Sequence, residues 1–170
     1  MAEKELGYRP CVGIMVINRD GLVWAGRRAG APDDAEGRGT WWQMPQGGID
    51  ENEDPRTAAL RELHEETGIR SVEIIGETTE WLRYDLPPEL VGHAWGGRYK
   101  GQKQKWFAMR FLGQDDEVQI NPPPGHQLEF DAWAWRPVDQ LLETIVPFKR
   151  AVYEKVIAEL GPLARPVRPT

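Results

Sequence analysis

The sequence has few of the features that mark secreted, disulfide-stabilised or membrane-spanning proteins. Its 170 residues include one cysteine, Cys11, so no disulfide can form within the chain and a multi-cysteine zinc site is excluded. No apolar run approaches the roughly 20 residues that a membrane-spanning helix needs, which excludes an integral membrane protein. The first six residues lack the basic and then apolar pattern of a signal peptide. We therefore expect a cytoplasmic protein without membrane attachment.

Positive charge is also in short supply. The 21 lysines and arginines are outnumbered by 27 aspartates and glutamates, which gives a formal net charge of −6 and an isoelectric point of about 5.2. Because proteins that grip a DNA duplex usually present a basic surface, we expect no duplex partner, although one end of a nucleic acid can still be bound. Acidic residues concentrate between positions 47 and 68, whereas residues 98–105 carry four cations and no acid. This distribution suits a metal ion beside a polyphosphate, and two solvated surfaces are the alternative.

The length and the pattern of apolar runs predict a single domain over residues 1–170. We expect its core between about residues 7 and 160, followed by a proline-containing flexible tail over 161–170. Short apolar runs bounded by turns predict strands over 12–17, 22–25, 41–44, 72–75, 79–84, 105–112, 118–120 and 129–135. Helices are predicted over 55–67, 138–145 and 148–160, with loops over 29–40 and 85–101. Together these elements indicate an α+β fold or an αβα sandwich around a mixed sheet.

The segment 55–67 is the clearest helix, and it carries an acidic face. Asp54 is a suitable N-cap residue directly before it. Glu62 lies three residues before Glu65 and four before Glu66, so all three carboxylates crowd one side of the helix, where they repel one another. A hard divalent cation such as Mg²⁺ removes this repulsion because it prefers carboxylate and water oxygens. The competing interpretation is a solvated acidic face.

Four residues around this helix suggest a structural frame for the glutamates. Glu53 lies just before the helix start, where negative charge is favourable. Arg61 follows eight residues later and can fold back onto Glu53 or pair with Glu65. The consecutive glycines Gly47 and Gly48 allow the backbone to approach a ligand or metal closely, although most such pairs mark turns.

These residues form a spaced pattern that resembles a known signature. From position 47 the sequence reads G-x5-E-x7-R-E-L-x-E-E-x-G-I, with fixed positions at Gly47, Glu53, Arg61, Glu62, Leu63, Glu65, Glu66, Gly68 and Ile69. This pattern is similar to the Nudix box of hydrolases that act on a nucleoside diphosphate linked to another group. The resemblance implies a loop–helix–loop within an αβα sandwich. It also implies Mg²⁺ or Mn²⁺ held by Glu62, Glu65 and Glu66, with the backbone of Gly47 beside them.

The resemblance extends over most of the chain. Further segments resemble the branch that contains bacterial RNA 5′-pyrophosphohydrolases and asymmetric diadenosine tetraphosphate hydrolases, namely residues 7–10, 42–49, 81–84, 101–107, 129–133 and 148–150. In that branch a glutamate of the fifth segment reaches the metals, which implies that Glu129 is a fourth ligand or a base. An exposed strand acid is the alternative for Glu129. The sequence departs from the branch in a long loop at 29–40 and a proline-rich segment at 121–125.

The same branch suggests the residues that bind substrate. Arg9, Arg28 and Lys149 match positions near the triphosphate or the leaving group, and arginine offers a planar fork that suits phosphate. Tyr84 can donate a hydrogen bond from its hydroxyl group to a phosphate oxygen. Phe148 is a candidate stacking face for the first base, although an aromatic residue more often belongs to a core.

The sequence therefore leads to one expected function and two alternatives. The expected function is Mg²⁺- or Mn²⁺-dependent cleavage of pyrophosphate linkages in 5′-triphosphate RNA, in dinucleoside polyphosphates, or in both. The first alternative is a strict diadenosine tetraphosphate hydrolase without an RNA role, because both substrates carry a phosphate chain on a nucleoside. The second is a catalytically silent Nudix-fold binding module, against which the complete set of box glutamates argues. The sequence indicates no particular protein partner.

Overall fold

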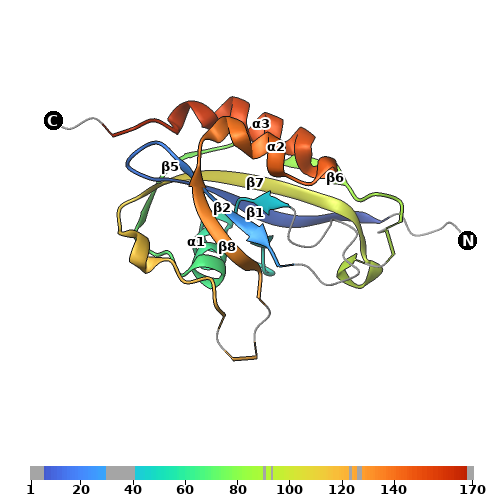
Figure 1. The fold of residues 1–170 in the computed structure, drawn as a ribbon. Helices are drawn as coiled ribbons and strands as arrows, with labels where there is room; N and C mark the ends of the chain where they lie inside the picture. Colours follow the sequence, from blue (N-terminus) through green and yellow to red (C-terminus); the bar gives the residue numbers. More distant parts are fainter. Residues whose placement is uncertain are drawn as a thin grey trace, which may run out of the picture.

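The computed structural model describes residues 6–29, 41–89, 91–92, 94–122, 124–125 and 128–167. A curved mixed sheet forms the middle layer, and helices cover both of its faces (Figure 1). The strands are β1 (Gly7–Ile17), β2 (Val23–Arg28), β3 (Trp42–Gln43), β4 (Gln46–Gly48), β5 (Val72–Glu77), β6 (Leu82–Asp85), β7 (Tyr99–Phe111) and β8 (Phe130–Arg136). The α-helices are α1 (Pro55–Thr67), α2 (Leu141–Thr144) and α3 (Arg150–Leu160). Short 3₁₀ turns are η1 (Ala94–Gly97), η2 (Asp115–Glu117), η3 (Val138–Gln140), η4 (Pro147–Lys149) and η5 (Gly161–Leu163).

The sheet is organised around β1 and β7, which run side by side in its centre (Figure 1). Their pairing is parallel and continues from Gly7 opposite Tyr99 to Ile17 opposite Arg110. β2 follows β1 in an antiparallel hairpin, and β8 pairs with β2. β5 and β6 pair antiparallel with β7, while the short β4 pairs with β1. The sheet is therefore mixed, as the sequence predicted.

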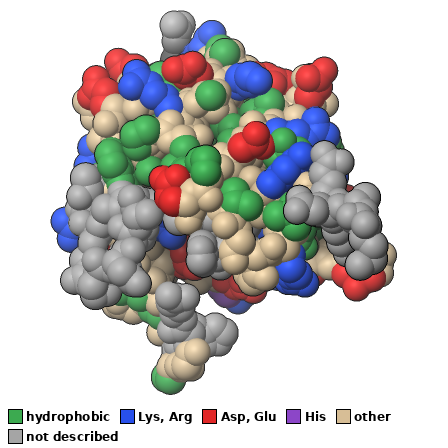
Figure 2. Space-filling model, turned by 90° about the vertical axis from the view of Figure 1, so that its right-hand side faces the viewer, with side chains coloured by type: hydrophobic (Ala, Val, Ile, Leu, Met, Phe, Trp, Pro, Cys, Tyr) green, Lys and Arg blue, Asp and Glu red, His purple; other side chains and the backbone are tan. Residues whose placement is uncertain are grey.

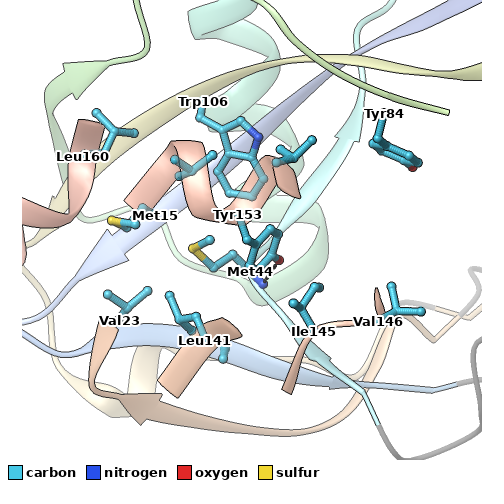
Figure 3. Packing of buried hydrophobic residues seen from close by; sticks show 14 of the residues in the cluster. Met15, Val23, Met44, Tyr84, Trp106, Leu141, Ile145, Val146, Tyr153 and Leu160 are labelled. Carbon is cyan, nitrogen blue, oxygen red and sulfur yellow. Dashed lines mark hydrogen bonds between the residues drawn. The ribbon is translucent and has the colours of Figure 1, made fainter. Parts of the chain in front are cut away.

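Two hydrophobic clusters hold the helices against the sheet. Because side chains alternate along a strand, Val12 and Ile14 face α1, whereas Met15 and Ile17 face α2 and α3. Trp106 belongs to the cluster that faces α2 and α3, and its ring centroid lies 5.6 Å from that of Tyr153 (Figure 3). The α1 layer, the sheet and the α2–α3 layer form the expected αβα sandwich. None of the helices in the described ranges is long and apolar enough to cross a lipid bilayer.

Several element boundaries differ from those predicted. The segment 118–120 is not a strand, because the amides of Val118 and Gln119 bond to the carbonyls of Asp115 and Thr67 rather than to a neighbouring strand. Residues 85–101, expected as a loop, contribute η1 and the start of β7. The helix predicted over 138–145 is instead the turn η3 followed by the four-residue α2.

The two segments expected to be irregular fall partly outside the described residues. Of the predicted loop at 29–40, residues 30–40 are not described. Of the predicted tail at 161–170, residues 161–167 make specific contacts. Val167 donates its backbone N–H to the carbonyl of Arg19 at 2.8 Å, and Leu163 packs against the cluster that faces α3. Specific contacts therefore continue to Val167, although its side chain is exposed.

Candidate active site

Helix α1 has both predicted ends, and it orients the three box glutamates differently. Asp54 caps its first turn by accepting hydrogen bonds from two backbone amides, and Gly68 ends it with a left-handed φ of 76°. Glu66 is 9% exposed and the Glu62 side chain 14% exposed, whereas 55% of the Glu65 side chain is exposed. Glu62 and Glu66 therefore face the interior, and Glu65 lies at the rim.

A single guanidinium holds the frame around these glutamates. Arg61 donates from Nε and Nη2 to both carboxylate oxygens of Glu53, each at 2.8 Å. Its Nη1 donates to Glu62 at 2.9 Å and to Glu65 at 3.2 Å, and its Nη2 also donates to the carbonyl of Gly48 at 2.9 Å. The hydrogen bond from Arg61 lowers the pKa of Glu53 to about 2. Both contacts expected for Arg61 are thus present at once.

The two glycines of β4 are places of close approach rather than a simple turn. A Cβ at Gly47 would overlap the carboxyl group of Glu62. A Cβ at Gly48 would lie 2.5 Å from Nη2 of Arg9. Because glycine has no side chain, a carboxylate and a guanidinium can each lie directly against the backbone here. A carboxylate packed against backbone suits a hard cation, which binds carboxylate and backbone carbonyl oxygens alike.

The buried carboxylates interact with one another. Burial raises the pKa of Glu62, and it raises the pKa of Glu66 well above the ordinary range, with further increases from the negative charges of Glu129 and Glu62. Oε2 of Glu66 accepts a hydrogen bond from the backbone N–H of Gln46 at 3.3 Å. A divalent cation would offset the repulsion between these neighbouring carboxylates. Within the described ranges, no three acidic, histidine or cysteine side chains are gathered tightly enough to form a complete ion site.

Nearly all predicted site residues meet in one cavity of about 340 Å³. Its lining includes Arg9, Arg28, Gly47, Gly48, Glu62, Glu66, Tyr84, Glu129, Phe148 and Lys149. Glu65 does not line it. A second cavity of about 760 Å³ adjoins the same helix and contains all four glutamates, Glu62, Glu65, Glu66 and Glu129. Glu62, Glu66 and Glu129 therefore line both the smaller cavity, which also contains the cationic side chains, and the larger one.

Aromatic rings and a buried lysine form one wall of the smaller cavity. The rings of Tyr84 and Phe148 lie 5.7 Å apart, and Lys149 Nζ lies 5.8 Å from the Phe148 ring centroid. Lys149 is only 5% exposed and donates to Oε1 of Gln43 at 3.5 Å. Burial raises the pKa of Tyr84, so its hydroxyl stays protonated. This wall can offer hydrogen-bond donors, and the Phe148 ring can offer a flat apolar face.

Sequence reasoning missed the glutamine side chains and the leucine of the lining. Gln43, Gln46 and Gln102 also border the cavity, together with Leu86. A signal was available, because glutamine and lysine alternate over residues 102–105 and strand geometry places alternate residues on one face. Two glutamines on the inner face of a strand indicate a polar interior.

Comparisons with known proteins agree with this geometry. A model of the NUDIX domain matches residues 7–156. Similar relatives include proteins named RNA pyrophosphohydrolase from Agrobacterium fabrum, 58% identical over 95% of this chain and 96% of the relative, and from Mesorhizobium japonicum, 60% identical over 94% of each. Among solved structures, a MutT protein from Methanosarcina mazei Go1 superposes with a TM-score of 0.62 at 20% identity, covering 90% of this chain and 95% of that one. A C. elegans Ap4A hydrolase complex gives 0.60 at 20% identity, covering 91% and 98%. The chain belongs to the Nudix family.

Proposed function

We propose that this Nudix hydrolase converts the 5′-triphosphate end of RNA into a 5′-monophosphate, with Mg²⁺ or Mn²⁺ as its cofactor. The observation that carries the proposal is one cavity in which the cations of Arg9, Arg28 and Lys149 share the lining with Glu62 and Glu66. Such a cavity suits a phosphate chain that is held at one end and cleaved at the other. Support comes from relatives about 60% identical over nearly their whole lengths that are named RNA pyrophosphohydrolases.

Glu62, Glu66 and Glu129, with the backbone of Gly47, would hold the divalent cation, and Glu65 would join them from the rim. Glu62, Glu66 and Glu129 line both cavities, whereas Gly47 lines the smaller one and Glu65 the larger one. When bound, a divalent ion neutralises phosphate charge and lowers the pKa of a water molecule. The oxygen ligands favour Mg²⁺ or Mn²⁺ over softer metals.

The chain's own residues would divide the remaining tasks. Arg9, Arg28 and Lys149 bind the phosphate oxygens and orient the phosphate groups of the substrate for in-line attack by water. The water oxygen forms a bond to phosphorus as the phosphoanhydride bond breaks, and pyrophosphate leaves. Glu129, which is exposed at the edge of both cavities, takes the proton of the attacking water. Phe148 stacks with the first base, an interaction that tolerates every base.

The site fits an RNA end better than a duplex. The face drawn in Figure 2 mixes acidic and basic side chains and presents no continuous basic surface. The cationic groups of the site are instead concentrated in the cavity. Because the proposed substrate is cellular RNA, we also place the protein in the cytoplasm.

Truncating Arg28 or Lys149 to alanine is expected to lower kcat/KM for triphosphate RNA by about tenfold to a hundredfold. The reason is that a hydrogen bond to a charged group contributes about 1.5–3 kcal/mol. The matched control is Arg150→Ala, which removes a neighbouring cation whose side chain is 57% exposed and lies 3.6 Å from Glu154. Steady-state kinetics on all three variants test the assignment. A similar loss in Arg150→Ala would mean that overall charge, rather than the cavity, determines the rate.

The function itself is tested by giving the purified protein 5′-triphosphate RNA and diadenosine tetraphosphate in parallel, each with Mg²⁺. We expect release of pyrophosphate from RNA and a 5′-monophosphate product. The Phe148→Ala variant is expected to impair RNA more than the dinucleotide. If the unmodified protein cleaves diadenosine tetraphosphate rapidly and triphosphate RNA negligibly, the RNA proposal is wrong and the enzyme is a strict dinucleoside polyphosphate hydrolase.

A further inference from the structure

A chain of buried amides runs from the core to the cavity. Gln104, which is 1% exposed, donates from Nε2 to Oε1 of Gln102 at 2.7 Å and to Oε1 of Gln46 at 3.2 Å. Its own Oε1 accepts a hydrogen bond from Nε1 of Trp106 at 2.8 Å. Gln102 and Gln46 line the cavity, whereas Trp106 is fully buried in the cluster that faces α3 (Figure 3).

The indole of Trp106 determines the orientation of the three side-chain amides, those of Gln104, Gln102 and Gln46. An indole N–H is a donor only, so the end of Gln104 that meets Trp106 must be its oxygen. The nitrogen of Gln104 must then face Gln46 and Gln102, and because it only donates, both of these present their oxygens to it. Because the side-chain oxygens of Gln46 and Gln102 are used by Gln104, their side-chain nitrogens are the polar atoms that can face the cavity. A cavity bordered by these two amides therefore offers N–H donors rather than carbonyl acceptors.

We propose that Trp106 and Gln104 are positioning residues that hold Gln46 and Gln102 as N–H donors toward the phosphate oxygens of the substrate. This inference rests on the proposed function, since phosphate oxygens are acceptors only and need donors at these places. The amides add donors without adding charge.

Gln46 also connects the row of buried amides to the catalytic carboxylates. Its backbone N–H donates to Glu66 at 3.3 Å, while its side chain is held by Gln104. The same residue thus spans the distance between the glutamates and the buried amides. The orientation set at Trp106 is transmitted to the part of the cavity where the phosphate chain meets the glutamates.

The test compares Trp106→Phe with Trp24→Phe. Both tryptophans are fully buried, but Nε1 of Trp24 has no hydrogen-bond partner among the residues that the structure describes. Both variants therefore lose similar core volume, and only Trp106→Phe loses the donor that orients Gln104. We expect KM for triphosphate RNA to rise about tenfold in Trp106→Phe with kcat within about threefold, as the loss of one or two neutral hydrogen bonds implies. Trp24→Phe should lower the midpoint of thermal unfolding and leave KM unchanged.

A second variant and a second measurement keep the inference separate from the proposed function. Gln104→Met has a similar shape without an amide, so it should raise KM as Trp106→Phe does. Binding of inorganic tripolyphosphate, measured by calorimetry, should weaken in both variants and not in Trp24→Phe. If the unmodified protein cleaves triphosphate RNA but these variants keep its KM and its tripolyphosphate affinity, the positioning role is wrong and the function stands. If RNA is not cleaved while tripolyphosphate binding still weakens selectively, the function is wrong and the positioning role stands.

Discussion

Replacing Glu66 by glutamine is expected to lower the turnover of triphosphate RNA by at least about a hundredfold, through the loss of metal-assisted activation of water. The same change is expected to raise the midpoint of thermal unfolding at neutral pH when divalent cations are removed. Burial and the charges of Glu129 and Glu62 raise the pKa of Glu66, so ionising it inside the protein costs stability. A neutral amide of the same shape avoids that cost and can still accept the hydrogen bond from Gln46.

Activity assays and thermal melts with and without Mg²⁺ test both parts of this expectation. Mg²⁺ should stabilise the unmodified protein and have a smaller effect on the variant, because a ligand stabilises the state that binds it. Glu143→Gln, on the exposed side of α2, is the control and should change neither property. Near-normal turnover of Glu66→Gln at millimolar Mg²⁺ would remove Glu66 from the catalytic set.

Gly47→Ala is expected to reduce turnover by about a hundredfold while the fold remains stable. The added Cβ would overlap the carboxyl group of Glu62, which is the end of a flexible side chain. Glu62 can therefore rotate away at little cost to stability, but it then leaves the place where the backbone and the carboxylate meet. Loss of activity without loss of stability separates a site residue from a core residue.

The matched control for this variant is Gly7→Ala at the start of β1, where an added Cβ meets no atom within 4 Å. Circular dichroism melts and kinetics on the two alanine variants complete the comparison. Turnover close to that of the unmodified protein in Gly47→Ala would mean that Glu62 works in a position other than the one seen here.

Local sequence signals predicted the parts of the fold that local chemistry determines. Asp54 and Gly68 mark both ends of α1 because capping depends on the nearest few residues. The same kind of reasoning failed at 118–120, where an apolar pattern suits a strand but the amides of Val118 and Gln119 bond to the carbonyls of Asp115 and Thr67. It also failed at Tyr99, which begins β7 only because β1 pairs with it from the far end of the chain.

The site followed the same division. The spacing of Glu62 and Glu66 on one helix face was visible in the sequence, and the family resemblance added Arg9 and Lys149. That these groups share one cavity depends on contacts between distant segments, which no local pattern encodes. Gln102 was overlooked because an amide carries no charge and so leaves no mark on the charge pattern of the sequence.

The pairing of β1 with β7 also determines the order in which the protein can be assembled during synthesis. β1 leaves the ribosome first, but its parallel partner is made only after the hairpin, α1, β5 and β6 have emerged. Contacts so distant in sequence are slow to form, since the intervening chain must first lose much of its freedom. The edge of β1 that pairs with β7 therefore has no parallel partner until β7 has been synthesised up to Phe111, and chaperones can protect this edge during that interval.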